Sequence, residues 1–263
     1  MKNNNKFRLD VWGAITLGTI ALYALFLLYP MAYLIRQSVL DPDTGGFTLA
    51  YFTKFFSKSY YFDTLINSFK VSITATVLSI AIGTPLAYLF TIFKIKGKSV
   101  LNILIVVASM SAPFIGAYSW ILLLGRSGVI TAFFKNLGIA IPDIYGFGGI
   151  VLVMTLQLFP LVFLYAKGAL KNIDNSLIEA AENLGCSGIA CFFKVVVPLI
   201  MPTLLAAALL VFMRSFADFG TPMLIGEGYR TFPVVLYTEF INEVGGSDGF
   251  AAAIAVIAIV VTT

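Results

Sequence analysis

The chain has 263 residues, of which 59% are hydrophobic and only 11% are charged, with a net charge of +4 and a mean hydropathy of +0.95. Soluble domains are roughly half apolar and about a quarter charged, so this composition excludes a soluble globular protein and predicts a membrane protein. Histidine is absent from the sequence, which excludes histidine-based hydrolases and the usual zinc sites. The two cysteines, Cys186 and Cys191, are too few for a disulfide framework, and we expect reduced thiols and no metal.

Apolar segments of membrane-crossing length follow one another along the chain. The first, Val11–Ile35, ends in large residues rather than in the small residues of a signal-peptide cleavage site, so we expect it to be retained. Three further segments free of charged residues are 71–93, 99–125 and 144–166, and a fifth apolar segment runs from about Leu199 to Ala217. Because lipid offers no partners to backbone amides, each is predicted to be a helix. The second, third and fourth spans are predicted to kink at Pro85, Pro113 and Pro160.

The last apolar run, Phe250–Thr263, has 14 residues, too few to cross a bilayer. We therefore expect a sixth helix that is cut short, with a second homologous half of the protein missing beyond it. The predicted fold class is an all-α membrane protein, a polytopic bundle of about six transmembrane helices. Residues 11–263 would form this transmembrane domain and residues 1–10 a cytoplasmic N-terminus.

Lysine and arginine are distributed unevenly over the connecting segments. If the N-terminus is cytoplasmic, segments 1–10, 94–99 and 167–194 carry nine of them in 44 residues, and the opposite segments carry seven in 85 residues. The positive-inside rule favours this orientation, with the loop after residue 166 in the cytoplasm. The small net charge reflects this orientation, and we expect no nucleic-acid partner.

The longest predicted cytoplasmic segment contains a short helical motif. Ser176 and Glu179 fit an S-x-x-E capping box, and Gly185 is placed to end the helix in a left-handed cap. Leu177, Ala181 and Leu184 would share one face, with Ala180 beside them. After the glycine, Ile189–Val197 is predicted to form a second short apolar element that ends at Pro198.

A nucleotide-binding loop would require G-x-x-x-x-G-K-[ST], but Gly97, Lys98 and Ser99 supply only its last three positions, with Ile92 where the first glycine belongs. We therefore predict that the chain is not an enzyme and does not itself hydrolyse ATP.

The residues of this motif resemble those of a known family. Glu179, Ala180, Ala181 and Gly185 match the EAAxxxG of the EAA loop in type I ABC importer permeases, the inner-membrane components of binding-protein-dependent transport systems. Val195, Val197 and Pro198 fall where that loop's closing I-x-L-P pattern lies.

The resemblance implies a bacterial inner-membrane permease whose loop 171–198 docks into a cleft of an ATPase subunit. It also implies an extracytoplasmic solute-binding protein, a second permease half or subunit, and no cofactor bound by this chain, since the partner uses the ATP. The coupling residues would be Glu179, Ala180, Ala181, Leu184, Gly185 and Pro198.

The segment RSFADFGTP, Arg214–Pro222, resembles the branch of this family that serves ferric iron, with phosphonate, thiamine and polyamine permeases as alternatives. Arg214 and Asp218 lie four residues apart and could form an ion pair in the substrate path, or an interfacial pair outside it. Residues 218–248 carry five acids and one arginine, which would attract a cation or contact the binding protein.

Two other classes of protein remain as alternatives. An ion-coupled secondary transporter would usually carry a charged site at the middle of the membrane, and no acid lies at the centre of these spans. A membrane-embedded enzyme would need a convergent set of titratable residues, but the spans offer mainly Ser, Thr, Asn102 and Gln157.

Overall fold

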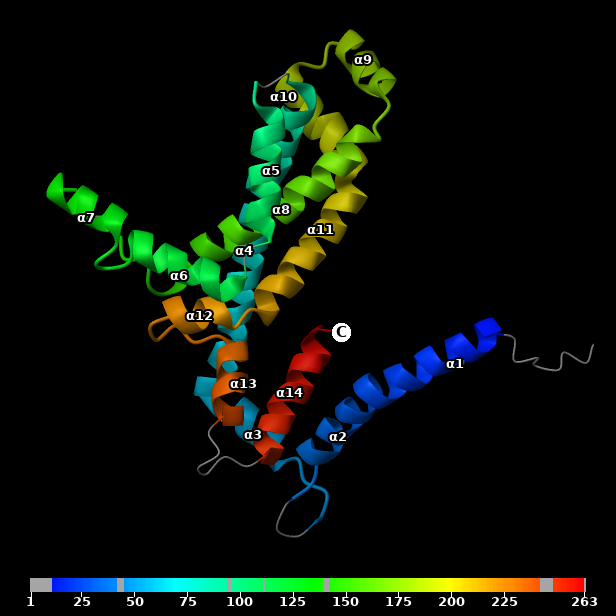
Figure 1. Cartoon of the computed structure of the whole chain (residues 1–263), viewed down its shortest axis with the longest axis vertical. Coiled ribbons are helices and arrows are strands. Elements are labelled where there is room, and N and C mark those ends of the chain that lie inside the picture. Colours follow the sequence, from blue (N-terminus) through cyan, green and yellow to red (C-terminus); the bar gives the residue numbers. More distant parts are fainter. Residues whose placement is uncertain are drawn as a thin grey trace, which may run out of the picture. The chain divides into compact units, whose positions relative to one another are not determined.

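The computed structural model describes residues 11–41, 45–93, 96–110, 112–139, 142–241 and 248–262, and within them the chain is helical (Figure 1). A single antiparallel bridge, between Leu40 and Phe47, is the only β-type pairing in these residues. The helices are, in chain order, α1 (Val11–Tyr23), η1 (Ala24–Leu28), α2 (Tyr29–Ser38), α3 (Ala50–Ser57), α4 (Ser59–Ile92), α5 (Lys98–Ser109), α6 (Pro113–Leu124), α7 (Val129–Asn136), α8 (Phe147–Lys171), α9 (Asn175–Asn183), α10 (Gly188–Cys191), η2 (Phe192–Val196), α11 (Val197–Ala217), α12 (Gly220–Ile225), α13 (Phe232–Ile241) and α14 (Asp248–Thr262). The prediction of an all-α membrane protein is confirmed.

The chain divides into two compact units, residues 1–62 with 238–263 and residues 63–237. In the first unit α14 packs along α2 and α3. The ring of Phe250 lies edge-on to that of Tyr61, with centroids 5.0 Å apart, and the ammonium of Lys54 lies 3.9 Å from the Phe250 ring centre. Gly249 is required there, because a Cβ atom would lie 2.4 Å from Cε2 of Tyr51.

Among the described residues, five helical stretches are long and apolar enough to cross a membrane. They are Val11–Ser38, Ser59–Ile92, Pro113–Asn136, Phe147–Lys171 and Gly188–Ala217. The first, second, fourth and fifth correspond to predicted spans, the second beginning at Ser59 rather than at Val71. None of the residues of α1 is buried, and an apolar helix exposed on every side is typical of contact with lipid.

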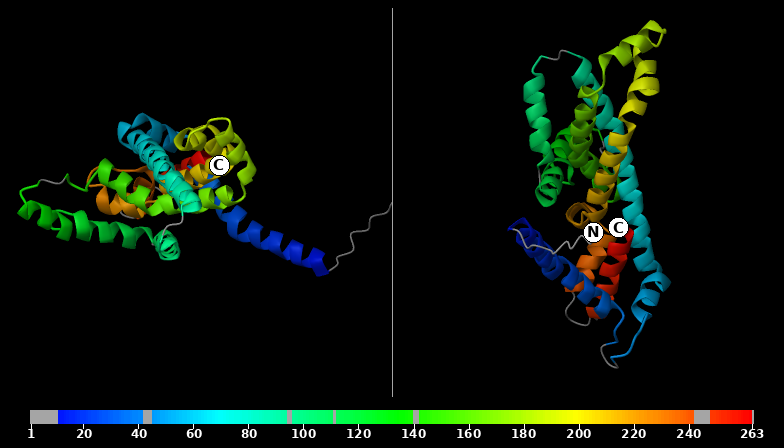
Figure 2. Two further views of the ribbon diagram at one scale, coloured as in Figure 1. Left: turned by 90° about the horizontal axis from the view of Figure 1, so that it is seen from above. Right: turned by 90° about the vertical axis from the view of Figure 1, so that its right-hand side faces the viewer.

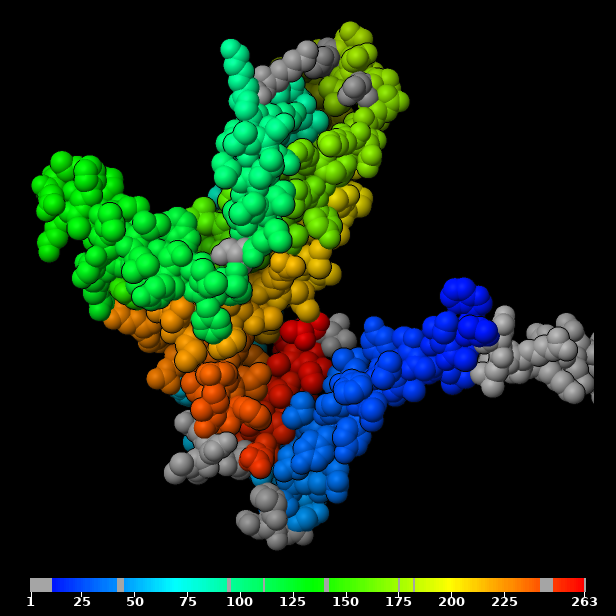
Figure 3. All heavy atoms as spheres, viewed as in Figure 1, coloured from blue at the N-terminus to red at the C-terminus, as the bar shows by residue number. Residues whose placement is uncertain are grey.

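The prediction of one kinked helix over 99–125 is wrong. Helix α5 ends at Ser109 and α6 begins at Pro113, and the intervening Ala112 has extended backbone angles, φ −67° and ψ 140°. Proline disfavours helical geometry in the residue before it, so Pro113 starts a new helix instead of bending an existing one. Figure 3 shows α7 projecting away from the rest of its unit.

The prediction that Ile189–Val197 forms a separate element ended by Pro198 is also wrong. Helix α10 leads through the π-helical turn η2 into α11, so that 188–217 is continuous. Proline clashes with the carbonyl four residues earlier, which here belongs to Lys194, at the centre of η2. The wider π turn accommodates the proline ring. The other π turn, η1, precedes Pro30 by the same spacing.

Several hydroxyl side chains within the spans bond to their own helix. Thr16 donates to the carbonyl of Trp12 at 2.8 Å, and Thr91 donates to that of Ala87 at 2.8 Å. Ser119 bonds in the same way, to the carbonyl of Ile115. Such bonds to the residue four positions earlier allow polar side chains to remain in an apolar solvent.

The core of the second unit forms where α8 packs against α4 and α11 (Figures 1 and 2). Its buried residues from α4 and α8 include Ala87, Phe90, Val162, Phe163 and Ala166. Gly83 of α4 lies at the closest approach, because a Cβ atom there would be 2.9 Å from the carbonyl oxygen of Phe159 and 2.9 Å from Cβ of Val162. Small residues at helix interfaces in membranes allow this close packing.

We predict that Gly83→Val lowers the free energy of unfolding by about 1 to 3 kcal/mol, the usual cost of overpacking, because two of the three obstructing atoms belong to the backbone. Titration of the purified protein with sodium dodecyl sulfate in mixed micelles would measure it. Gly168→Val is the matched control, since Gly168 lies within α8 with no atom near its Cβ position. Equal destabilisation by both variants would contradict the packing role of Gly83.

Candidate functional site

Helix α9 lies in the connection between α8 and α10, beyond the ends of α8 and α11 (Figure 1). It begins with a cap from Asp174, whose Oδ1 accepts the backbone N–H of Ser176 at 3.0 Å. Hydrogen bonds from the backbone and then the side chain of Ser176 hold the pKa of the Asp174 carboxyl below its usual value. The N-cap is therefore Asp174, and the prediction of Ser176 in that role is wrong.

The other end of α9 closes as the sequence predicts. Gly185 adopts φ +84°, the left-handed conformation that glycine tolerates best. The N–H of Cys186 donates to the carbonyl of Ala181 at 3.0 Å, which is the long bond of a Schellman motif. The N–H of Leu184 donates to the carbonyl of Ala180 at 3.1 Å. Helix α9 is thus a short rigid element with defined ends.

An apolar surface, the α9 patch, is formed by Leu177, Leu184 and Ile189. Their exposed fractions are 49%, 89% and 79%. Glu179 and Ala180 are also exposed, whereas Ala181 is half-buried. Leu177 and Leu184 lie outside the spans, and Ile189 is the second residue of the stretch Gly188–Ala217. Large apolar side chains exposed at this end indicate a contact surface for another molecule.

The same loop is firmly attached to the spans. Phe192 of η2 is buried, and its ring lies 4.6 Å from that of Tyr88 in α4, measured between centroids. Val196 is fully buried in the core that α4, α8 and α11 form, and Ile178 of α9 packs against this core. Pro198 is exposed in the first turn of α11 and makes no part of this core. Displacement of α9 would therefore be transmitted to α4, α8 and α11 through close-packed side chains.

A cavity of about 450 Å³ lies near the far end of α11. It is lined by Ser109, Pro113, Phe114, Gln157, Leu158, Arg214, Ala217, Asp218, Phe219 and Gly220, which include both residues predicted for the substrate path. The Nε2 atom of Gln157 is buried without a hydrogen-bond partner, so a ligand or water that accepts a hydrogen bond would satisfy it.

Asp218 bonds to the helix that follows it. Its Oδ1 accepts the N–H groups of Gly220 and Thr221 at 2.9 and 3.3 Å, and its Oδ2 accepts the Thr221 hydroxyl at 2.6 Å. No ion pair joins Arg214 to Asp218 in the part of the chain that the structure describes. The cavity is thus lined by one cation and one anion that do not neutralise each other directly.

A network that the sequence did not reveal ties three loops together. Arg126 donates from Nη2 to both carboxylate oxygens of Glu227 at 2.7 Å, and from Nε to Asp143 at 3.2 Å. Its guanidinium lies 4.9 Å from the ring centre of Tyr145. Glu227 has φ +40°, an uncommon conformation for a residue with a side chain. The loops that carry Arg126, Asp143 and Glu227, all predicted to lie on the external side, are therefore in contact.

Both cysteines are free thiols, Cys191 buried and Cys186 half-buried, as the sequence predicted. Among the described residues, no three Cys, Asp or Glu side chains come together in a group that could hold a metal ion.

These features define a class: a multi-pass helical membrane protein whose spans are rigidly joined to a short capped helix outside them. Comparison with known proteins identifies the family. Residues 46–263 match the family described as the binding-protein-dependent transport system inner membrane component. The chain belongs to this family, and it is a multi-pass inner-membrane protein with the type I ABC importer permease fold.

Similar proteins transport different solutes. The ferric transport system permease protein FbpB of Actinobacillus pleuropneumoniae is 28% identical over 240 residues, which are 90% of this chain and 34% of that protein. The spermidine/putrescine transport system permease protein PotB of Haemophilus influenzae is 28% identical over 262 residues, which are 95% of this chain and 89% of that protein. The chain spans about a third of the length of the ferric-transport relatives.

The crystal structure of a bacterial alginate ABC transporter in complex with an alginate-bound periplasmic protein superposes with a TM-score of 0.77. It covers 96% of this chain and 90% of the other at 16% identity. At this identity the likeness establishes the fold.

We predict that Gly185→Ala loosens the end of α9, because a left-handed residue with a side chain costs about 1 kcal/mol more than glycine. Hydrogen–deuterium exchange of peptides covering 175–186 should become severalfold faster. Gly188→Ala is the control, since Gly188 has an ordinary φ and free space around it. Unchanged exchange in the Gly185 variant would contradict the capping role.

Proposed function

We propose that this chain is a permease subunit, or one half of a permease, in an ATP-driven importer that receives its solute from an external binding protein. The observation that supports this most directly is the capped helix α9, which exposes an apolar patch and yet is joined through Phe192 to the core of the spans. In this proposal α9 is cytoplasmic. Residues 1–10, which are not among the described residues, are cytoplasmic as well. A separate ATP-binding-cassette subunit hydrolyses the ATP, and a second permease half completes the pathway.

The proposed coupling runs from the α9 patch to the spans. Leu184 and Ile189 enter a groove of the ATPase, and the exposed carboxylate of Glu179 bonds to polar groups at its rim. When the ATPase subunits close on nucleotide, α9 moves with them. Because Phe192 and Val196 are packed against α4 and α8, this motion reorients the spans and changes access to the pathway.

We propose ferric iron as the solute, with a polyamine as the second candidate. Support for iron comes from the ferric-transport relatives and from the segment Arg214–Pro222. Support for a polyamine comes from a relative that matches over nearly its whole length. Both solutes are cations. The half-buried carboxylate of Asp218, which lines a cavity of about 450 Å³, is the charge that would attract either one.

We predict that Leu184→Asp and Glu179→Lys weaken co-purification of the ATPase at least tenfold while the chain still inserts into the membrane. The first buries a charge in the ATPase groove, and the second reverses the charge at its rim. Leu184→Met and Glu179→Gln are the matched controls, which preserve the apolar surface and the polar contact. Wild-type ATPase binding and uptake in both charge variants would reject the coupling role of α9.

We predict that Asp218→Asn lowers solute-stimulated ATP hydrolysis by the reconstituted complex, by about tenfold, because it removes the negative charge. Asparagine retains an oxygen that can accept the amides of Gly220 and Thr221, so the local fold is kept. ATP hydrolysis would be measured with binding protein loaded with ferric iron and, separately, with binding protein loaded with spermidine. The cation that stimulates hydrolysis more strongly is the solute. If neither cation stimulates the wild type, the proposal of a cationic solute is rejected and that of an importer is not.

A further inference from the structure

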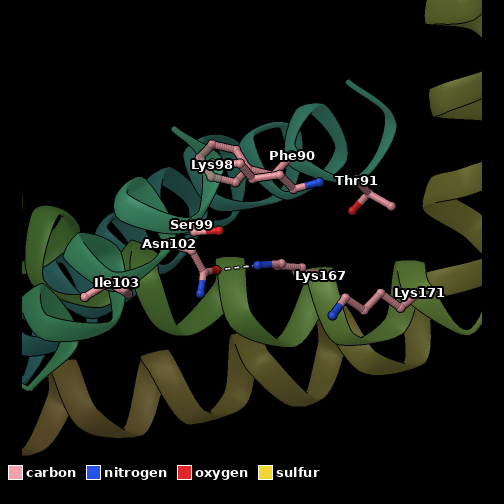
Figure 4. A pocket seen from close by; sticks show the side chains of 8 residues that line it. All are labelled: Phe90, Thr91, Lys98, Ser99, Asn102, Ile103, Lys167 and Lys171. Carbon is pink, nitrogen blue, oxygen red and sulfur yellow. Dashed lines mark hydrogen bonds between the residues drawn. The ribbon is translucent and has the colours of Figure 1, made fainter. Parts of the chain in front are cut away.

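A second cavity, of about 460 Å³, lies at the α9 end of the unit formed by residues 63–237. It opens between the last turn of α4, the first turns of α5 and the end of α8 (Figure 4). Its lining residues are Phe90, Thr91, Lys98, Ser99, Asn102, Ile103, Lys167 and Lys171. Nothing proposed above for transport or coupling uses this cavity.

The cavity is strongly cationic. Three lysines line it, and none of the lining residues is acidic. Within the described residues Lys98, Lys167 and Lys171 form no ion pair, and Lys98 and Lys171 act on Lys167 as like charges. Figure 4 shows the ammonium of Lys167 directed at Asn102, to whose Oδ1 it donates a hydrogen bond. Lys98 and Lys167 are half-buried, and half-buried like charges are costly without a counterion.

The start of α5 adds donors to the same space. Ser99 lies in the first turn of this 12-residue helix, where the N–H groups have no carbonyl partner within the helix. The N-terminus of a helix attracts anions through these groups and through the helix dipole. Gly97, at φ +79°, ends the preceding turn. Ammonium groups, a hydroxyl and helix N–H groups around one cavity together match a phosphate.

The wall of the cavity continues into an apolar surface. Val100, Ile103, Leu104 and Val107 are 58% to 61% exposed and, at spacings of three and four residues, lie on one face of α5. Ile103 belongs both to this face and to the cavity lining. An apolar face of this kind contacts acyl chains in a bilayer, so a lipid with its phosphate in the cavity can place an acyl chain along α5.

We propose that this cavity binds an anionic phospholipid, with Lys98, Lys167 and Lys171 around the phosphate and an acyl chain along the α5 face. The predicted orientation of the chain places these lysines at the cytoplasmic surface of the membrane, where basic pockets between helices bind anionic headgroups. The lipid supplies the missing counterion and joins α5 to α8.

Native mass spectrometry of the purified full chain, exchanged into equal amounts of phosphatidylglycerol and phosphatidylcholine with identical acyl chains, tests this proposal. The wild type should retain phosphatidylglycerol preferentially. Each lysine contributes roughly fivefold to binding of an anionic headgroup, so the double variant Lys98→Gln, Lys171→Gln should reduce the preference by roughly twenty-fivefold. Lys98→Arg with Lys171→Arg should keep it.

The control double variant is Lys58→Gln, Lys135→Gln, which removes the same charge from two exposed lysines that do not line the cavity. It should behave as the wild type. Equal retention of the two lipids by the wild type, or the same loss of preference in both glutamine variants, would overturn the site. A large excess of inorganic phosphate should leave phosphatidylglycerol bound, and its complete displacement would assign the site to soluble phosphate instead of lipid.

Discussion

The packing of Phe192 and Val196 against α4 and α8 is the interaction on which the proposed mechanism depends. Apolar side chains gain little by leaving lipid for one another, so helices in membranes associate through close contact instead of through the hydrophobic effect. This unit achieves such contact with the aromatic pairs Tyr88–Phe192 and Phe90–Phe163, and with Gly83 where two backbones meet. Without this core, α9 would be a capped helix joined to the spans by flexible segments alone, and its movement would not be transmitted to them.

The sequence predicted the spans well where their ends are marked by charge. Val11–Ile35 and 144–166 were found because absence of charge over a bilayer's thickness is a one-dimensional property. It did not predict the break at Ala112, since 99–125 is equally free of charge and Pro85 and Pro160 lie inside continuous helices. Whether a proline interrupts a helix depends on what packs around the freed carbonyl, which only the fold determines.

For the candidate sites too, the sequence predicted features that depend on local residues and missed those that depend on the fold. Gly185 was predictable because a left-handed cap is a local requirement. The role of Asp174 was missed because Asp174 and Ser176 are both good caps, and the choice between them depends on where the helix starts. Asp218 follows the last residue of α11 with extended angles, φ −73° and ψ 118°, so it turns away from Arg214 despite the helical spacing. The cavity lined by Lys98, Lys167 and Lys171 joins residues up to 81 positions apart in the sequence, beyond the reach of any local pattern.

The π turn before Pro198 has a geometric consequence. A π turn contains one surplus residue, and one residue of an α-helix corresponds to a rotation of about 100°. The azimuth at which α9 presents Leu184 is therefore fixed by chain length within 192–196 as much as by side-chain chemistry. Deleting one of these residues would swing the loop more than a quarter of the way around the α11 axis while leaving every side chain of α11 in place. In this segment an insertion or deletion would change the direction that α9 faces more than most substitutions would.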